Sequence, residues 1–289
     1  MPQDREKISK AVLITGCSSG IGHATAERLA AAGWTVYATA RRPDALASLA
    51  AKGCKTLALD VDDEASMRAA VETVERAEGA VGVLINNAGY SQSGAVESVA
   101  MDKIRRQFET NVFGLVRLTQ LVLPGMRAQR WGKILNISSM GGRFTFPGGG
   151  FYHATKHAIE AISDALRFEV RGFGIDVVVI EPGLIRTDFG NAAVSSMSGV
   201  PKEEGPYADF NTMVAKTTKE VYEKGPLAML GGTPDAVANV IQRAITASRP
   251  KARYTVTASA KLLLAQRRLM SDGVWDAFLR TQFPQPGKS

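Results

Sequence analysis

The sequence predicts an α/β fold with a single doubly wound parallel sheet and helices on both of its faces. Short apolar runs alternate with longer stretches of helical spacing through the first 183 residues. Strand–helix alternation with right-handed crossovers produces a parallel sheet. The runs are continuously apolar, which indicates strands that are buried on both faces. No linker, repeat or low-complexity segment interrupts the first 183 residues, so residues 1–289 are expected to form one domain.

Single residues predict where several of the helices begin or end. Gly33 after the first helix and Pro43 at the start of the second are typical helix boundaries. The long fourth helix is expected to stop at Pro124, because proline has no N–H donor. Thr233 and Pro234 are typical of a helix cap and first turn. The strands are predicted at residues 11–15, 35–40, 55–61, 82–86, 132–138, 175–182 and 249–257. The helices are predicted at residues 21–33, 43–53, 64–77, 101–123, 152–171, 233–247 and 258–270.

The charge of the chain is unevenly placed. Residues 240–289 carry nine Lys or Arg and two Asp, whereas residues 1–239 carry 26 residues of each sign. A neutral body argues against a nucleic-acid-binding protein, so no nucleic-acid partner is expected. The basic C-terminal extension, residues 258–289, needs a separate explanation.

The composition predicts a cytoplasmic protein. The first ten residues lack the apolar core and small-residue cleavage pattern of a secretory signal. No run of about 18 apolar residues suggests a membrane-spanning helix. The two cysteines, Cys17 and Cys54, are too few for a disulfide framework and suit a reducing compartment. Both are expected to be small buried hydrophobic residues.

A glycine-rich turn, TGCSSGIGHA, follows the first predicted strand. Gly16, Gly20 and Gly22 permit a tight turn and let the backbone approach a pyrophosphate without a Cβ in the way. The helix that starts near Gly20 would point its free N–H groups and its positive dipole end at that phosphate. A plain turn is the alternative, but the position between strand and helix favours a Rossmann-type dinucleotide site. Ser18, Ser19 and Ile21 lie in the same turn and are included in the predicted site.

Several motifs in chain order resemble the short-chain dehydrogenase/reductase family. The glycine spacing G-x-x-x-G-x-G and the YHATK stretch at 152–156 are the first two. LDV, NNAG, NISSMGG and PGLIRT then follow successive predicted strands, and Asn111 lies in the helix after NNAG. The resemblance covers about residues 10–190. It implies a nucleotide cofactor held by Asp60, Val61, Asn87, Ala88, Gly89, Tyr152, Lys156, Pro182, Gly183, Ile185 and Thr187.

The end of the second predicted strand indicates which cofactor is bound. An acidic residue there would accept a hydrogen bond from a ribose hydroxyl, but the sequence has Arg41 and Arg42. Arginine presents a planar charged fork that suits phosphate. NADP(H) is therefore expected over NAD(H), with Arg41 as the main contact and Ser18 as a second; solvated surface charge is the alternative. By the resemblance Asp60 accepts from the adenine amino group, and a helix cap is its alternative.

Tyr152 and Lys156 lie four residues apart, so their side chains share one face of a helix. They are a proton-transfer pair or merely neighbours, and the surrounding motifs favour the first interpretation. A tyrosine has a pKa of about 10, and a nearby cation such as the ammonium of Lys156 lowers it. In the family the catalytic serine usually lies thirteen residues before the tyrosine, which selects Ser139 over Ser138. By the resemblance Asn111 anchors a water behind Lys156 and Thr187 orients the nicotinamide.

These residues predict an NADP(H)-dependent oxidoreductase that interconverts a carbonyl and an alcohol, with Tyr152 as proton donor and acceptor. The alternative is a non-catalytic NADP(H)-binding regulator on the same fold, and the presence of all four catalytic residues favours the enzyme. His153 and His157 lack ligand spacing and are expected to lie on the helix surface or pack, so no metal is expected. A homodimer or homotetramer is expected.

Residues 184–230 lack a clear period and are expected to form a substrate-binding flap. Their apolar residues predict a lipophilic substrate, although packing of the flap on the body explains them equally well. The ending of the chain is most similar to the 17-beta-hydroxysteroid and retinol dehydrogenase branch, which implies steroids, retinoids or similar compounds. The basic amphipathic stretch 258–270 either contacts a membrane surface peripherally or packs on the body or on a second subunit.

Overall fold

The computed structural model describes residues 8–201, 204–223 and 228–287. Seven parallel strands form one sheet in the order β3-β2-β1-β4-β5-β6-β7. The strand order reverses between β1 and β4, which creates the crevice where ligands bind in this class of sheet. The predicted fold is confirmed, and all seven predicted strands are present. The strands are β1 Val12–Ile14, β2 Val36–Ala40, β3 Lys55–Ala58, β4 Val83–Asn86, β5 Gly132–Ile137, β6 Ile175–Glu181 and β7 Arg253–Thr255.

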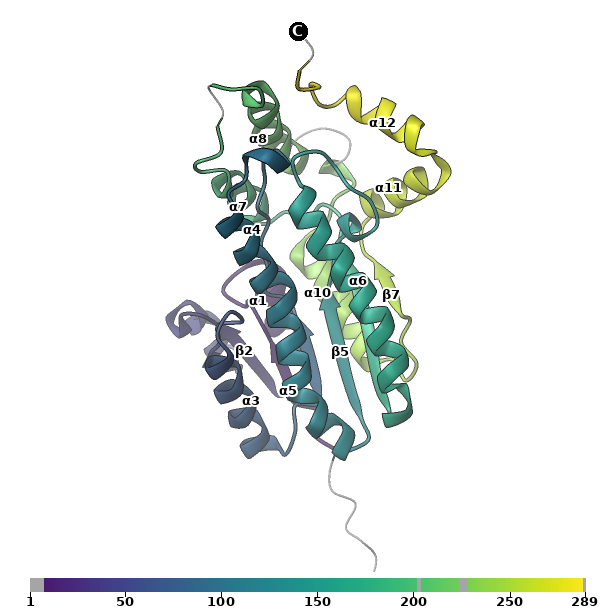
Figure 1. Cartoon of the computed structure of the whole chain (residues 1–289). Helices are drawn as coiled ribbons and strands as arrows, with labels where there is room; N and C mark the ends of the chain where they lie inside the picture. The colour runs from purple at the N-terminus through teal and green to yellow at the C-terminus, as the bar shows by residue number, and fades with distance from the viewer. Residues whose placement is uncertain (1–7, 202–203, 224–227, 288–289) are drawn as a thin grey trace, which may run out of the picture.

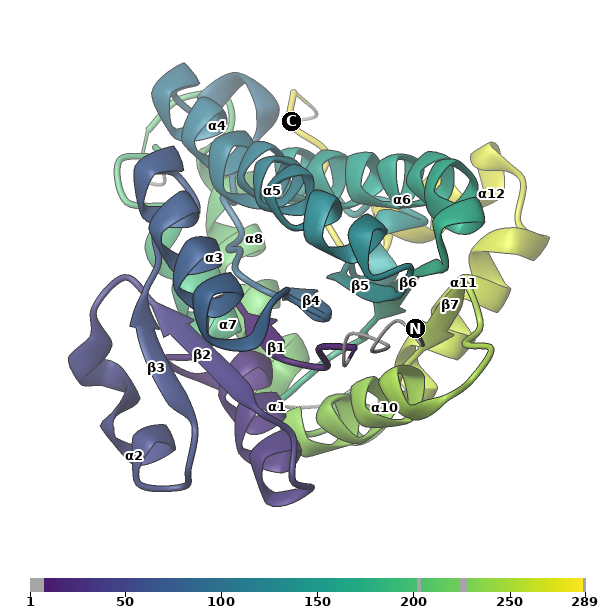
Figure 2. The same cartoon turned by 90° about the horizontal axis from the view of Figure 1, so that it is seen from below.

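Helices cover both faces of the sheet (Figures 1 and 2). On one face lie α1 (Gly20–Ala31), α2 (Ala47–Ala50) and α10 (Pro234–Thr246), and on the other lie α3 (Glu64–Glu78), α5 (Gly114–Ala128) and α6 (Gly150–Val170). Successive residues of β1 supply both hydrophobic clusters: Val12 and Ile14 face the first layer and Leu13 faces the second. The strands β1, β2, β4, β5 and β6 are therefore buried on both faces, whereas the two edge strands, β3 and β7, are partly exposed.

The expected helix 101–123 differs from the structure. It consists of α4 (Met101–Phe108), a π-helical turn (Glu109–Phe113) and α5, which passes through Pro124 and ends at Ala128. The prediction that the helix stops at Pro124 is wrong. Proline removes the hydrogen bond to the carbonyl four residues earlier, and that residue, Gln120, is exposed, so water can satisfy its carbonyl. The buried side chains of α5 on either side of Pro124 pack on the sheet and stabilise the helix.

The expected helix 43–53 is only partly helical. It begins with the short 3₁₀ helix η1 (Pro43–Leu46) and continues as α2, a single turn. Within the part of the chain that the structure describes, the other 3₁₀ helices are η2 (Val96–Ser98), η4 (Met140–Gly142) and η5 (Arg171–Phe173).

The sequence predicts an irregular segment at 184–230, but the structure is partly helical there. It contains α7 (Phe189–Ser196) and α8 (Ala208–Glu223). Phe210 and Val214 lie one turn apart on α8, and both are buried in a separate hydrophobic cluster. The four-residue spacing of these two apolar residues is typical of a helix and could be seen in the sequence. Part of the predicted flap, residues 202–203 and 224–227, lies outside the described residues, as do residues 288–289 of the predicted C-terminal extension.

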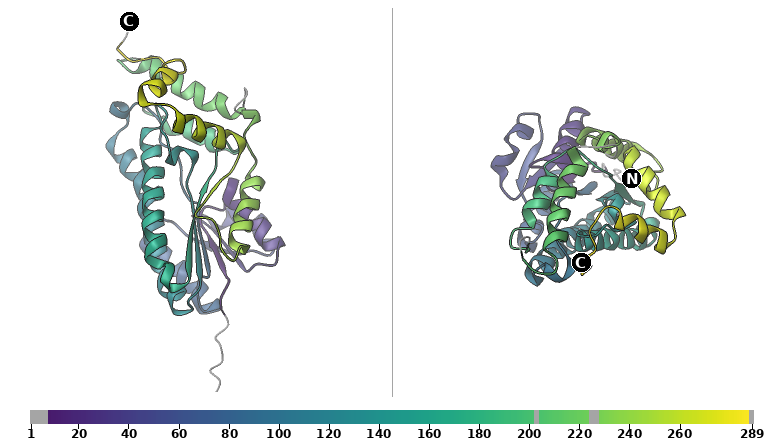
Figure 3. Two further views of the ribbon diagram at one scale, coloured as in Figure 1. Left: turned by 90° about the vertical axis from the view of Figure 1, so that its right-hand side faces the viewer. Right: turned by 90° about the horizontal axis from the view of Figure 1, so that it is seen from above.

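Two helices follow β7 at the C-terminal end of the chain. α11 (Ala258–Leu269) confirms the predicted helix, and α12 (Asp272–Arg280) was not predicted. Both lie beyond the carboxyl ends of the strands, on the same end of the molecule as α8 (Figures 1 and 3). Among the described residues, no helix is both long and apolar enough to cross a bilayer.

Candidate active site

The glycine turn between β1 and α1 has the conformation that only glycine adopts readily. Gly16 has a φ of +70°, which a residue with a Cβ rarely adopts. At Gly22 a Cβ would lie 2.4 Å from the carbonyl oxygen of Gly16 and 2.5 Å from Nδ2 of Asn87. Both positions therefore exclude a side chain, and the turn leaves its backbone open to a ligand.

Hydrogen bonds join the carboxyl ends of β1 and β4 below this turn. Nδ2 of Asn87 donates to the carbonyl oxygens of Thr15 (2.9 Å) and Gly16 (3.0 Å). Oγ1 of Thr15 accepts from the backbone N–H groups of Asn87 and Ala88, both at 2.9 Å. Asn87 thus holds the glycine turn in place. Thr15 was not among the predicted site residues, although a polar residue at the end of a buried strand was a signal for it.

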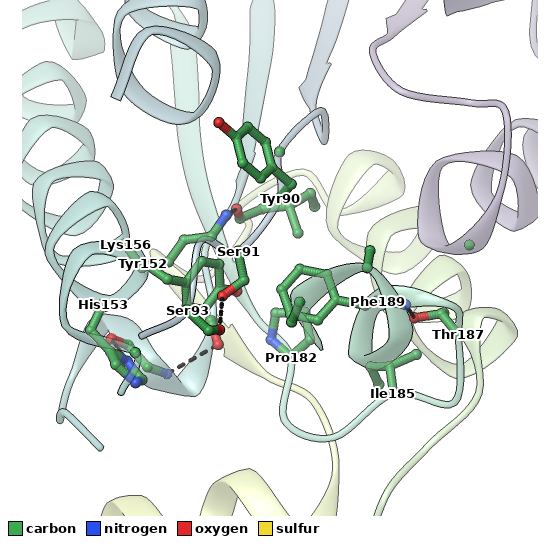
Figure 4. A pocket seen from close by; sticks show the side chains of 18 of the residues that line it. Tyr90, Ser91, Ser93, Tyr152, His153, Lys156, Pro182, Ile185, Thr187 and Phe189 are labelled. Carbon is green, nitrogen blue, oxygen red and sulfur yellow. Dashed lines mark hydrogen bonds between the residues drawn. The ribbon is translucent and has the colours of Figure 1, made fainter. Parts of the chain in front are cut away.

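A cavity of about 630 Å³ extends from this turn to the C-terminal helices. Most of the predicted site residues line it, and Figure 4 shows several of them around one space. Gly22, Arg42 and Asn111 do not line it. The predicted residues that do are Gly16, Ser18, Ser19, Gly20, Ile21, Arg41, Asp60, Val61, Asn87, Ala88, Gly89, Ser139, Tyr152, Lys156, Pro182, Gly183, Ile185 and Thr187.

Arg41 and Asp60 lie where β2 and β3 end. Arg41 is exposed, lines the cavity and forms no ion pair with a described residue. Oδ1 of Asp60 accepts from the backbone N–H of Asp62 (3.1 Å). The carboxylate that caps α3 belongs to Asp63, which accepts from the N–H of Ala65. The alternative reading of Asp60 as the helix cap is therefore wrong.

Tyr152 and Lys156 lie on one face of α6 and both enter the cavity (Figure 4). Nζ of Lys156 is 5.7 Å from the centre of the Tyr152 ring and donates to the carbonyl oxygen of Ile137 (2.8 Å). Ser139, at the end of β5, forms a hydrogen bond with Tyr152, and its Oγ accepts from the N–H of Gly141 (3.1 Å). Ser139, which comes from the segment after β5, therefore meets the Tyr152–Lys156 pair of α6 in one part of the cavity wall.

Burial dominates the acid–base behaviour of this pair. It raises the pKa of Tyr152 to about 12, and the hydrogen bond with Ser139 acts in the opposite direction. It lowers the pKa of Lys156 to about 8, against the attraction of the Glu160 carboxylate. The sequence predicts that Lys156 lowers the pKa of Tyr152. The structure differs because enclosure by protein disfavours both charged forms, and this effect is the larger one.

Asn111 lies in the π-helical turn between α4 and α5, a feature that is frequent at functional sites. Its Oδ1 accepts from the N–H of Tyr90 (3.0 Å), and its Nδ2 donates to the carbonyl oxygen of Tyr90 (2.9 Å) and to Oγ1 of Thr155 (3.1 Å). Both side-chain donors are thus used within the protein. Asn111 connects the cavity-lining Tyr90 to α6 and does not itself reach the cavity.

His153 packs next to the pair, as one of the two sequence interpretations expected. It is buried, its Nδ1 lies 2.9 Å from the carbonyl oxygen of Gly141, and its Nε2 accepts from the N–H of Phe146. Burial lowers the pKa of His153 to about 4, so the imidazole is neutral. It holds the loop after Ser139 against α6. Among the described residues, no three His, Cys, Asp or Glu side chains gather as a metal site.

The comparison with protein families identifies the class. The family model described as short chain dehydrogenase matches residues 10–198, which is more than half of the chain. The chain belongs to this family, and the resemblance seen in its motifs is confirmed at that level. It is an NAD(P)-dependent oxidoreductase that acts on CH–OH groups. The match does not distinguish the 17-beta-hydroxysteroid and retinol dehydrogenase branch from others.

Two bacterial relatives that are named as reductases are similar over much of the chain. The NADPH-dependent 3-dehydrocapnine reductase of Ornithobacterium rhinotracheale is 36% identical and aligns over 91% of this chain and 94% of its own. The 3-ketodihydrosphingosine reductase of Bacteroides thetaiotaomicron is 42% identical over 68% of this chain and 71% of its own.

Solved structures share the fold. A short-chain dehydrogenase from Streptomyces avermitilis is 35% identical, with a TM-score of 0.78 and coverage of 94% of this chain and 96% of that chain. A short-chain dehydrogenase/reductase from Burkholderia phymatum in complex with NAD is 24% identical, with a TM-score of 0.76 and coverage of 97% and 98%. At that identity the second structure supports the fold alone.

Proposed function

We propose that this oxidoreductase uses NADP(H) to interconvert a ketone and an alcohol on a lipophilic substrate, with Tyr152 as proton donor and acceptor. The observation that carries the proposal is the arrangement of Tyr152, Ser139 and Lys156 in the wall of the cavity that also contains the glycine turn. The site thus combines a place for a dinucleotide with a proton donor.

The residues of the turn fit a dinucleotide. Gly16 and Gly22 leave no room for a Cβ, and the N-terminus of α1 begins at Gly20, where free N–H groups attract phosphate. When bound, the nicotinamide of such a cofactor supplies or accepts the hydride. The protein supplies the orientation and the proton.

Tyr152 and Ser139 have different roles at the substrate oxygen. With a pKa of about 12, the Tyr152 phenol is protonated at neutral pH, which suits donation to the alkoxide that forms during reduction. Ser139, hydrogen-bonded to Tyr152, is placed to bind the same oxygen and stabilise its developing charge. Below a pH of about 8 Lys156 carries a positive charge that favours the phenolate left behind.

The far end of the cavity supports a lipophilic substrate. Its walls include Phe144 and Phe146, whose ring centres lie 5.1 Å apart, and Phe189 and Tyr222 from α7 and α8. Leu263 of α11 also contributes, so the predicted flap and the C-terminal extension both form walls. The names of the two relatives describe reductases of a 3-dehydro and a 3-keto compound, which agrees with a ketone. The expectation of steroids or retinoids stays a prediction.

Cofactor choice and activity are tested together by a reduction assay with Arg41 variants. With a long-chain ketone, the wild type should have a higher kcat/KM for NADPH than for NADH. Arg41→Ala should lower the NADPH value about 10- to 100-fold and leave the NADH value nearly unchanged, because a charge-assisted phosphate contact contributes about 1.5–3 kcal/mol. Arg42→Ala is the matched control, since Arg42 does not line the cavity. An unchanged NADPH value in Arg41→Ala would refute the assignment of Arg41.

A further inference from the structure

The helix α11 has one face inside the protein and one face outside. Ser259, Ala260 and Leu263 are buried, and Leu263 lines the cavity. Leu262 is 51% exposed and Leu269 is 87% exposed. These two leucines are seven residues apart, so they lie on the same side of the helix. One alternative from the sequence was that α11 packs on the body. This packing explains the residues of its inner face but not the exposed leucines of its outer face.

Basic side chains accompany the exposed leucines. Lys261 and Arg268 are also seven residues apart, are exposed, and form no ion pair with a described residue. Arg267, in contrast, is paired with Asp272 at 2.5 Å. The outer face of α11, formed by Lys261, Leu262, Arg268 and Leu269, therefore combines free positive charge with large apolar side chains.

The exposed apolar surface extends beyond α11. The N–H of Ser259 donates to the carbonyl oxygen of Leu230 (3.0 Å), which places residues 229 and 230 beside the start of α11. Met229 is 84% exposed and Leu230 is 37% exposed. Val274 on the following helix, α12, is 52% exposed. Of the eleven large hydrophobic residues that are exposed in the described part of the chain, five therefore lie on α11, on α12 or beside the start of α11.

The position of this surface connects it to the cavity. α11 and α12 lie at the end of the molecule beyond the carboxyl ends of the strands (Figures 1 and 3). Leu263 of α11 and Phe278 of α12 line the cavity. One helix thus forms part of the cavity wall on its inner side and presents the basic and apolar residues on its outer side.

We propose that the outer face of α11 docks the protein on an anionic membrane surface. Charge complementarity favours this occupant, because Lys261 and Arg268 of this face form no ion pair with a described residue and α11 has no acidic residue. A second copy of the chain is disfavoured, because a two-fold interface would bring the same basic residues together. Docking here brings the cavity next to the bilayer from which a lipophilic substrate would enter.

Binding to vesicles tests the proposal without any use of the reaction. The full chain should sediment with vesicles that contain phosphatidylglycerol, be released by added salt, and not bind vesicles of phosphatidylcholine alone. Each basic side chain near an anionic surface contributes roughly fivefold to partitioning, so Lys261→Glu with Arg268→Glu should weaken binding about 30-fold or more. Leu262→Ser with Leu269→Ser should also weaken it.

The matched control is Lys10→Glu with Arg76→Glu, which changes the net charge equally at exposed positions before β1 and on α3. This variant should bind like the wild type. The proposal would be overturned if the wild type did not bind anionic vesicles, or if the α11 charge variant bound them as tightly as the control. So would a change of oligomer mass in the α11 variants by light scattering, because it would assign the face to a subunit contact. The proposed reaction stands independently of each of these outcomes.

Discussion

Replacement of Tyr152 by phenylalanine should lower kcat for ketone reduction by about 1,000-fold or more and change NADPH affinity less than about twofold. The variant loses only a hydroxyl, which is hydrogen-bonded to Ser139 at the cavity wall. Its ring contacts with His153 and Phe189 can remain. Steady-state kinetics and titration of NADPH by its fluorescence measure the two quantities separately.

Tyr222→Phe is the matched control for this variant. Tyr222 is another phenol in the same cavity, and burial raises its pKa as it does that of Tyr152. Its removal should leave most of the turnover intact, since Tyr222, unlike Tyr152, has no hydrogen bond with a serine among the described residues. Substantial turnover in Tyr152→Phe, or equal losses in both variants, would contradict the assigned role of Tyr152.

Lys156→Met should lower kcat about 100- to 1,000-fold. The ammonium group, whose Nζ lies 5.7 Å from the centre of the Tyr152 ring, stabilises the phenolate that Tyr152 becomes when it gives up its proton. An opposite charge at about 6 Å contributes roughly 3 kcal/mol at an effective dielectric constant of about 20. The variant also loses the hydrogen bond to the carbonyl oxygen of Ile137. Initial rates of ketone reduction at saturating NADPH measure the effect.

The pH dependence gives this prediction a second readout. Burial lowers the pKa of Lys156 to about 8, so the charged form is present below that pH and is lost above it. Reduction by the wild type should therefore slow as the pH rises through about 8, and the residual activity of Lys156→Met should lack this step. Lys133→Met is the control: Lys133 is equally buried, but it bonds to the carbonyl oxygen of Ala247 away from the cavity. A preserved pH step in Lys156→Met would contradict the role of this lysine.

The sheet was predictable because each strand carries its own signal. Runs such as Val12–Ile14 are apolar without interruption, and burial on both faces explains that pattern. The predictions of secondary structure were wrong where tertiary packing outweighs the intrinsic preference of the local sequence. Pro124 is tolerated because its helix is held on the sheet by neighbouring buried side chains. α8 was missed because its apolar spacing is diluted by polar residues that face solvent.

The cofactor turn and the Tyr152–Lys156 pair were also predictable, since both depend on short sequence spacings. The substrate end was predictable only in part: apolar residues within 184–230 were expected to bind a lipophilic substrate, but how the separate segments come together was not. Phe146, Phe189, Tyr222 and Leu263 come from four separate segments and line one cavity only after the chain has folded. Likewise, Thr15 stands out as a polar residue at the end of a buried strand, but no local pattern indicated that its partners would be the backbone N–H groups of Asn87 and Ala88.

The most direct measurement is NADPH consumption, with alcohol formation, across a series of straight-chain ketones of increasing length. If the cavity binds the chain in an apolar environment, kcat/KM should rise about fourfold for each added CH₂ group until the cavity is filled, because each buried CH₂ contributes about 0.8 kcal/mol. NADPH that binds but is not consumed with any ketone of the series would contradict the proposed reaction. Consumption that does not depend on chain length would contradict the lipophilic substrate.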